Sequence, residues 1–505
     1  MAERERMSTV DTAWLRMDRP NNLMMIVGVL LFDGPVDAAR LRDTLEARML
    51  ERFPRFRQRP VQDATGWHWE TERRFQIDRH LRTAKLARRG GPGALQRFVG
   101  RLAAKPLDPR HPRWQFHLVH GYDGGSALVI RIHHCYADGI ALVGVMLQMT
   151  DATPDAAPAA PGDDAPPPRS ARAATGGLAA LLEPLPDVVR QAIRFSGKAG
   201  QKYLELLRNP DQIVHYAGVA AQVATEVADL ATMPDDSRTL FKGRPTTEKR
   251  VAWAAPVPLD DVKAVGRALG CSVNDVLLSC VAGALRRYLV ERGAPVAGVE
   301  IRAMVPVNLR PPGRIEKLGN RFGLVTLLLP VGTVNPLMRL QQVHDRMEAL
   351  KTSYQPLVAY GILALAGVAP HAVQKQGLDL LANKATAVMT NVPGPQQPLY
   401  FAGRRIVDLM FWVPQSGDIG MGVSILSYAG GVQFGLITDA GRVPDPGRVV
   451  AGFGAELERL VLAVMMEPWD EIRDPLLVEH EIAAAGRTAN ALSGKTPRRP
   501  AKRSP

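Results

Sequence analysis

The chain has 505 residues, of which 46% are hydrophobic, 22% charged and 6% aromatic, and this composition excludes collagen-like, coiled-coil and wholly disordered proteins. The three cysteines include no CxxC pair, which excludes a disulfide framework and gives no indication of a zinc site. The longest apolar runs, 23–32 and 357–369, are shorter than the roughly 18–20 residues of a membrane span, and the charged N-terminus lacks the apolar segment of a secretory signal. We expect a globular, cytoplasmic protein that contacts membranes only peripherally.

Residues 1–150 are predicted to form a lobe of mixed helices and strands. After the turn Asp33-Gly34-Pro35, Asp37 precedes apolar residues at helical spacing, which predicts a helix capped by Asp37. The segments 114–120 and 126–133 read as strands, and the glycine-rich residues between them predict a hairpin. An apolar helix is expected at 140–149.

A change in composition separates this lobe from the rest of the chain. Residues 151–177 contain nine alanines, six prolines and no larger aliphatic or aromatic residue. Such a segment cannot bury enough surface to offset the entropy of ordering it, so it is predicted to be an extended linker. Residues 178–234 have a helical pattern that is basic in its first half, and we expect an amphipathic helical connector.

A second lobe is predicted over residues 235–475. It opens with two helices that meet between Gly270 and Ser272. Six strands are expected after them, at 300–307, 322–331, 386–390, 406–413, 422–428 and 432–438. The turn between the last two strands resembles the hairpin of the first lobe, which suggests that the two lobes are built alike.

The C-terminal residues 487–505 form a basic tail, with six Lys and Arg and no acidic residue, so they supply +6 of the net charge of +13. Their composition predicts disorder. The tail is either a solvated end or a contact for anionic lipid headgroups, to which each basic residue contributes about 1 kcal/mol near the surface. No nucleic-acid partner is expected, because no aromatic residues are interleaved with the basic ones.

The densest chemical signal is the segment RIHHCYADGIALV at 131–143, which contains His133, His134, Asp138 and Gly139. Side chains alternate across a strand, so the two histidines point to opposite sides and only one of them faces a given cleft. Asp138 is interpreted as a loop anchor that pairs with an arginine elsewhere, for which Arg310 is a candidate. Zinc needs three or four converging ligands, and because the histidines diverge we predict no metal.

This motif and many other stretches of the chain resemble those of a known protein family. HHxxxDG is similar to the active-site signature of the CoA-dependent acyltransferase superfamily, and the chain most closely resembles the bacterial bifunctional wax ester synthase/diacylglycerol acyltransferase family. The stretches that fit are residues 7–35, FPRFRQR at 53–59, PLDPRHPRW at 106–114, 271–289, VPVNLRP at 305–311, GNRFG at 319–323, TNVPGP at 390–395 and 427–439. One departure is Arg113, where the family usually has leucine.

The resemblance implies a mixed α/β fold of two lobes, each like a chloramphenicol acetyltransferase subunit, with a tunnel between them. It implies transfer of a long-chain acyl group from acyl-CoA to diacylglycerol, giving triacylglycerol, or to a long-chain alcohol, giving a wax ester. By this match His134 is the general base, His133 supports it and Gly139 leaves access to it. A neutral imidazole can take the hydroxyl proton and return it to the CoA thiolate, for about 10²–10⁴-fold acceleration, without an acyl-enzyme or a cofactor. The acceptors place the protein at the inner membrane face or on lipid inclusions.

Two segments, 272–275 and 391–395, each have both a structural and a functional interpretation. Ser272 and Asp275 resemble a helix capping box, whereas the family pattern treats Asn274-Asp275 as an active-site element in which Asn274 contacts the oxyanion or the substrate carbonyl. Residues 391–395 form either a tight turn or a loop in the tunnel wall.

Two other functions stay open at this point. The chain could be a different HHxxxDG acyltransferase, of the condensation or polyketide-lipid-esterifying type, which would recognise a carrier protein. It could also be a non-catalytic lipid-binding protein whose histidines are vestigial.

Overall fold

A computed structural model describes residues 4–86, 91–154, 232–309, 318–368 except 352 and 354, 374, 384–466, 476, 477 and 480. The linker from residue 155, almost all of the helical connector, Arg310 and the basic tail lie outside these ranges. What the sequence predicts for those segments therefore stays a prediction.

The first lobe is built on a seven-stranded sheet in the order β5-β6-β7-β2-β15-β14-β8. Its strands are β2 (Met25–Phe32), β5 (Leu81–Lys85), β6 (Trp114–Tyr122), β7 (Gly125–His133), β8 (Thr150–Asp151), β14 (Tyr400–Phe401) and β15 (Arg404–Trp412). Its helices are α1 (Thr9–Arg16), α2 (Ala38–Leu45), α3 (Pro92–Ala103) and α4 (Gly139–Gln148). A small separate sheet contains β1 (Arg4–Arg6), β3 (Gln58–Asp63) and β4 (Gly66–Thr71).

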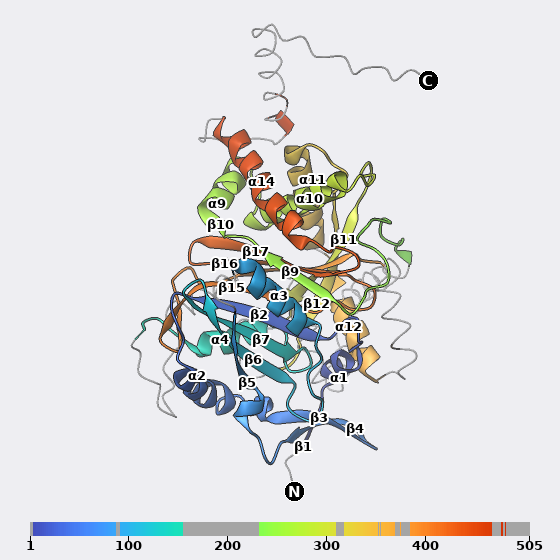
Figure 1. Ribbon diagram of the computed structural model, residues 1–505. Coiled ribbons are helices and arrows are strands. Elements are labelled where there is room, and N and C mark those ends of the chain that lie inside the picture. Colours follow the sequence, from blue (N-terminus) through green and yellow to red (C-terminus); the bar gives the residue numbers. More distant parts are fainter. Residues whose placement is uncertain are drawn as a thin grey trace, which may run out of the picture.

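The second lobe holds another seven-stranded sheet, ordered β10-β17-β16-β13-β11-β12, with β9 also paired to β17. Its strands are β9 (Lys249–Trp253), β10 (Val257–Pro258), β11 (Ile301–Asn308), β12 (Phe322–Leu329), β13 (Ala387–Pro393), β16 (Met421–Tyr428) and β17 (Gly431–Asp439). Its helices are α9 (Leu259–Ala268), α10 (Val273–Glu291), α11 (Pro336–Lys351), α12 (Gln355–Val368) and α14 (Pro446–Met465). Figure 1 shows the two lobes stacked, with α9, α10, α11 and α14 gathered on the outer side of the second one.

The local signals in the sequence are confirmed. Asp37 caps α2, because its side chain accepts a hydrogen bond from the Arg40 amide at 2.8 Å. Both predicted hairpins close through two residues with positive φ, Asp123-Gly124 between β6 and β7 and Ala429-Gly430 between β16 and β17. Two positive φ values are what a type I′ hairpin turn requires. The resemblance between the two turns is therefore also a resemblance of backbone geometry.

The strand predicted at 406–413 was assigned to the wrong lobe. As β15 it pairs with β2, with Leu409 opposite Leu30, and so belongs to the sheet of the first lobe. The predicted linker also starts too early, because Asp151 is part of β8 and lies 2.7 Å from Arg48 in an ion pair. The alternation of apolar residues in a strand indicates which side chains face a core, but it does not indicate which other strand will pair with that strand. The chain thus returns to the first lobe before it completes the second.

Helix α3 connects the two lobes by packing. Its Leu95 and Val99 share one core with Val29 of β2 and with Trp253 of β9, which belongs to the second sheet. Figure 1 shows α3 lying across both lobes. Within the described part of the chain no single helix is both long and apolar enough to cross a membrane, and α9 and α10 reach that length and composition only as a pair bent by 103°.

Candidate active site

The HHxxxDG segment forms the turn between β7 and α4. The strand ends at His133, whose amide donates to the carbonyl oxygen of Arg113 at 2.9 Å. The amide of His134 donates to the Met24 carbonyl at 2.7 Å, and α4 begins at Gly139. The backbone of both histidines is therefore held by neighbouring segments before any side chain is considered.

His134 lies on the wall of a cavity of about 790 Å³ between the two lobes, together with Asp138, Gly139 and Asn391. Its ring stacks on Trp14 at 4.2 Å between centroids, and the side chain is only 2% exposed. Burial lowers the pKa of His134 to about 4, because the charged imidazolium is costly in an apolar surrounding. The ring is therefore neutral at physiological pH and has a nitrogen lone pair that can accept a proton.

This shift predicts an unusual pH dependence. A free histidine loses half of its base form near pH 6.5, whereas kcat/KM of this protein is expected to stay level from about pH 8 to about pH 5 and to fall only as the pH approaches the pKa of His134 near 4. The depressed pKa also lowers folding stability as the pH falls below that of an unfolded histidine, so circular dichroism at each pH is the control. A profile that falls with a midpoint near 6.5 while the protein stays folded would contradict the burial of the base.

His133 faces a different environment, as the alternation predicts. Its Nδ1 accepts a hydrogen bond from the Cys135 amide at 3.2 Å, and its Nε2 lies 3.3 Å from a carboxylate oxygen of Asp18. Asp18 also accepts from the Met24 amide at 2.7 Å and lies 3.7 Å from the guanidinium of Arg113. The residue that departs from the family pattern therefore contacts the carboxylate that orients His133. Among the described residues no group of three or more His, Cys, Asp or Glu side chains is placed to hold a metal ion.

Asp138 ties the turn to two other elements. One carboxylate oxygen accepts from the Ala141 amide at 2.9 Å and so caps α4, and the other accepts from the Arg321 amide at 2.9 Å. These contacts are those of a loop anchor, and the hydrogen bond from the Arg321 amide joins the turn to the second lobe. The predicted pairing with Arg310 lies outside the described residues.

Replacing Asp138 by asparagine is expected to lower both thermal stability and turnover. Asparagine still caps α4, but its amide group would face the Arg321 N–H, which loses its acceptor. This hydrogen bond is partly buried, and a donor left without a partner costs up to about 1–3 kcal/mol, measurable as a lower Tm. The matched control is Asp37→Asn, an N-cap remote from the cavity. An inactive Asp138→Asn protein with an unchanged Tm would indicate a direct chemical role and contradict anchoring.

Two residues that support the site were not singled out from the sequence. Asn320 donates through its side-chain amide to the carbonyl of His134 at 2.8 Å and to Asp11 of α1 at 2.7 Å. Burial raises the pKa of Asp11, and the hydrogen bonds from Asn320 oppose that rise. Both residues fall inside the stretches 7–35 and 319–323 that carry the family resemblance, and that location was the only signal available to find them.

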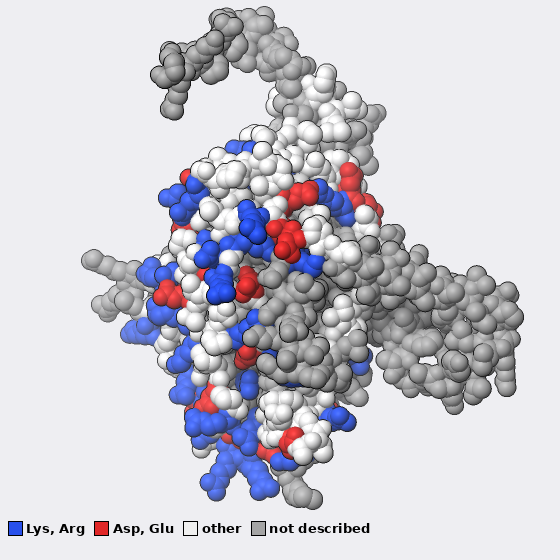
Figure 2. All heavy atoms as spheres, turned by 90° about the vertical axis from the view of Figure 1, so that its right-hand side faces the viewer, with Lys and Arg blue, Asp and Glu red and all other residues white. Residues whose placement is uncertain are grey.

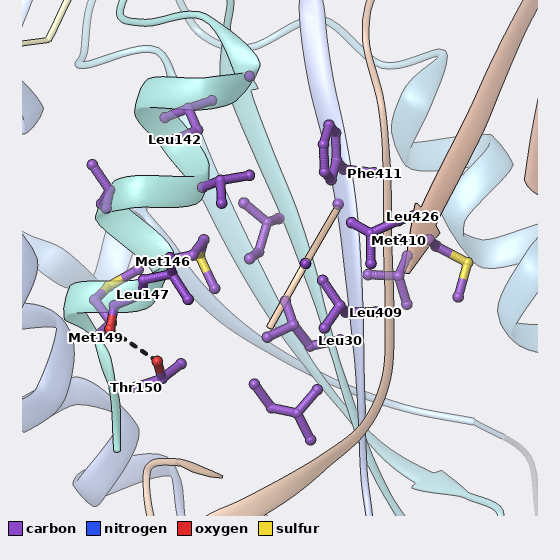
Figure 3. A pocket seen from close by; sticks show the side chains of 18 of the residues that line it. Leu30, Leu142, Met146, Leu147, Met149, Thr150, Leu409, Met410, Phe411 and Leu426 are labelled. Carbon is purple, nitrogen blue, oxygen red and sulfur yellow. Dashed lines mark hydrogen bonds between the residues drawn. The ribbon is translucent and has the colours of Figure 1, made fainter. Parts of the chain in front are cut away.

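Gly139 lies where the His134 cavity meets a second, apolar cavity of about 910 Å³, and it lines both. Figure 3 shows side chains from several elements around this second space, among them Leu142 and Met146 of α4, Leu409 of β15 and Leu30 of β2. Among the described residues on its wall, Thr150 has the one polar side chain, and its hydroxyl donates to the Leu147 carbonyl at 2.9 Å. The almost wholly apolar lining suits a hydrocarbon chain.

The structure places Asn274 directly behind the wall of the His134 cavity. The capping box is confirmed, since Ser272 and Asp275 exchange hydrogen bonds at 3.2 and 2.9 Å. Asn274 is not among the residues that line the His134 cavity; its side-chain oxygen instead accepts from Asn391 at 2.6 Å, and Asn391 is on the wall. The segment 391–395 lies on the wall, because Val392, Gly394 and Pro395 line the apolar cavity, but residues 391–393 still belong to strand β13 and are not a loop.

Comparisons with known proteins agree with this geometry. Residues 7–277 match the wax ester synthase/diacylglycerol acyltransferase catalytic domain, and residues 318–461 match the C-terminal domain of the same family. A probable diacylglycerol O-acyltransferase of Mycobacterium tuberculosis is 29% identical over 466 residues, covering 90% of this chain and 95% of the relative. A putative diacylglycerol O-acyltransferase of the same organism is 28% identical over 479 residues, covering 91% and 97%.

Solved structures confirm the expected two-lobed α/β fold. A wax ester synthase/diacylglycerol acyltransferase from Marinobacter aquaeolei VT8 superposes with a TM-score of 0.63 at 22% identity, covering 91% of this chain and all of that one. The first condensation domain of the calcium-dependent antibiotic synthetase superposes with 0.54 at 17% identity, covering 93% and 98%. These two likenesses concern the fold, whereas the match to the catalytic domain spans more than half of the chain. The chain belongs to the wax ester synthase/diacylglycerol acyltransferase family and is an acyltransferase.

Proposed function

We propose that the protein transfers a long-chain acyl group from acyl-CoA to diacylglycerol or to a long-chain alcohol, with His134 as the general base. The observation that carries the proposal is the placement of His134, neutral and buried on a cavity wall that continues past Gly139 into an apolar cavity. The names of the relatives support these substrates. No metal or cofactor takes part in this scheme, since acyl-CoA is itself a substrate.

In this mechanism both substrates meet at His134. The imidazole takes the hydroxyl proton of the acceptor as its oxygen forms a bond to the thioester carbon. The tetrahedral intermediate then breaks its carbon–sulfur bond, and the imidazolium returns the proton to the CoA thiolate. An amide NH₂ has two donor hydrogens, and Asn391 gives one of them to Asn274. The second hydrogen can therefore stabilise the oxyanion, so that Asn274 acts by positioning Asn391.

A thiol-release assay tests the proposal. The purified protein is incubated with palmitoyl-CoA and is offered hexadecanol, diolein or no acceptor in parallel. CoA release that depends on either acceptor, with the ester detected by mass spectrometry, is the expected result. Lipid binding without CoA release would contradict catalysis and favour a vestigial site. No turnover of free acyl-CoA, but turnover of a carrier-bound acyl group, would favour a condensation-type enzyme.

The acceptors also determine where the enzyme must work. Diacylglycerol and long-chain alcohols partition into bilayers and lipid droplets, so we propose that the protein docks on the inner face of the membrane or on lipid inclusions. The basic residues of the tail at 487–505 support this, because their charge is attracted to anionic headgroups.

Deleting residues 487–505 is expected to weaken binding to anionic vesicles while turnover on detergent-dispersed substrate stays nearly intact. The deletion removes six positive charges, and the lost affinity must be sensitive to salt because exposed charges are screened beyond about 8–10 Å at physiological ionic strength. Co-sedimentation with phosphatidylglycerol vesicles at two salt concentrations measures the effect, and neutral phosphatidylcholine vesicles are the control. Equal binding of the full and truncated chains would show that the tail is only a solvated end.

A further inference from the structure

A second polar pocket lies on the first lobe, at the edge of the sheet formed by β5 and β6. It spans about 830 Å³ and is lined by Arg79, Arg82, Lys105, His111 and Gln115, with Asp108 among its other wall residues. The described acidic groups beside it already have basic partners, since Asp108 binds Arg110 at 2.7 Å and Glu72 lies 2.7 Å from His111 and 3.5 Å from the guanidinium of Arg79. The pocket therefore has an excess of positive charge.

A buried arginine next to the pocket wall adds to this excess of positive charge. Arg131 of β7 is 1% exposed, and its guanidinium donates to the side-chain oxygen of Gln115 at 3.1 Å and to the carbonyl of Lys105. No carboxylate of the described residues lies within 4 Å of it, and burial lowers the pKa of Arg131 to about 10. Burying a charge without a counter-charge is unfavourable because the charge loses its hydration, so a buried charge is normally paired.

Only part of this charge is compensated inside the protein. Lys105 lies just after the end of α3, and a helix C-terminus carries a partial charge of about −0.5. The surrounding chain adds to the imbalance, because residues 52–131 contain seventeen Lys and Arg against six Asp and Glu. Figure 2 shows Lys and Arg gathered along one edge of the molecule, at the left of that view. A concave site with one sign of charge concentrates the field and attracts counter-ions.

The wall also contains a buried polar atom without a partner. His80 is buried, and its Nδ1 lies 2.9 Å from the Trp114 carbonyl, whereas its Nε2 has no hydrogen-bond partner among the described residues. The ring is held between Trp114 and Phe75, at 4.4 and 5.0 Å. Because Nδ1 donates to a carbonyl and burial lowers the pKa of His80, Nε2 of the neutral ring is an acceptor, and a water molecule or the P–OH of a singly protonated phosphate can donate to it.

We propose that this pocket binds a phosphate group. The guanidinium groups of Arg79 and Arg82 can each form paired hydrogen bonds to phosphate oxygens, Lys105 adds a point charge, and the anion supplies the counter-charge for Arg131. A phosphate group can come from the CoA moiety of the donor or from a phospholipid headgroup. Binding at this pocket does not depend on the chemistry at His134, so its failure would leave the proposed reaction untouched.

Thermal unfolding of the full chain tests the site with inorganic phosphate, against sodium chloride of equal ionic strength. The test variant is Arg82→Gln/Lys105→Gln, whose residues are exposed, and the matched control is Arg97→Gln/Arg101→Gln, which removes two exposed charges of α3 outside the pocket. Phosphate is expected to raise the Tm of the wild type and the control, because a ligand that binds only the native state stabilises it. The apparent phosphate affinity of the test variant is expected to be at least about tenfold weaker. No phosphate-specific shift in the wild type, or an equal shift in the test variant, would overturn the site.

Arg131→Met tests the buried charge, and two further probes identify the source of the phosphate. If Arg131 only caps α3, its replacement leaves the phosphate response unchanged, which would overturn its role in the site; a weaker response supports it.

Isothermal titration with free CoA and binding to phosphatidylcholine vesicles with and without phosphatidic acid then compare the wild type with Arg82→Gln/Lys105→Gln. A loss of CoA affinity assigns the pocket to the donor, and a loss of binding specific to phosphatidic acid assigns it to a headgroup. If the variant loses neither, the proposal is wrong.

Discussion

Replacing His134 by alanine is expected to lower kcat/KM for acyl transfer by about 10²–10⁴-fold, the usual contribution of a general base. The variant lacks the imidazole that takes the acceptor proton, whereas the two adjoining cavities that bind the substrates are retained. The variant is expected to stay folded, because the backbone of the turn is still held by the hydrogen bonds to Met24 and Asn320.

The measurement is steady-state thiol release together with a thermal melt of each variant. His68→Ala is the control, since His68 lies on β4 in the small separate sheet, away from the cavity. His133→Ala separates the two histidines of the motif, and we expect it to change turnover less than His134→Ala because the ring of His133 faces Asp18. Near-normal turnover of a folded His134→Ala protein would show that the general-base assignment is wrong.

Replacing Gly28 by leucine is expected to shorten the acyl chains that the enzyme accepts. Gly28 lies in the middle of β2, where every residue is buried, and it lines the apolar cavity. A Cβ at this position would meet Ile130, Met410 and Phe411 at 3.6–3.8 Å, which are ordinary contact distances. The backbone therefore does not require glycine here, and a larger side chain would extend into the cavity.

The position of Gly28 along the sheet determines which substrates are affected. It pairs with Ile130, four residues before His134, which is about 13 Å along a strand at about 3.3 Å per residue. An acyl chain long enough to reach past Gly28 would be blocked by the leucine side chain, whereas a shorter chain would end before it. We expect kcat/KM for palmitoyl-CoA to fall by about tenfold or more, which is the discrimination that a hydrophobic pocket shows against methylenes that do not fit. We expect kcat/KM for octanoyl-CoA to stay nearly unchanged.

A series of acyl-CoA chain lengths measures this effect at a saturating concentration of one acceptor. Gly454→Leu is the control, because that helical glycine of α14 has nothing within 4 Å of its would-be Cβ and lines neither cavity. An unchanged length profile, or an equal loss at every length in a folded protein, would mean that the apolar cavity does not hold the acyl chain.

The sequence by itself determined the features that depend on residues close together in the chain. The cap at Asp37, the capping box at Ser272 and Asp275 and the two hairpin turns were all readable, because their hydrogen bonds join residues at most a few positions apart. HHxxxDG was readable for the same reason: the end of a strand, a turn and a helix start fall within seven residues. The opposite orientation of the two histidines followed from the alternation of a strand.

Only the tertiary structure decided which distant segments meet. It placed β15 beside β2, brought Asn320 to the carbonyl of His134 and set the Arg321 amide against Asp138. It also showed that Asn391 lies on the cavity wall and that Asn274 lies behind it, as its hydrogen-bond partner. These contacts join residues more than a hundred positions apart, and an apolar or polar pattern does not specify its partner at that separation. The depressed pKa of His134 has the same origin, because the ring is buried by side chains distant in the chain, Trp14 of the first lobe and Phe322 of the second.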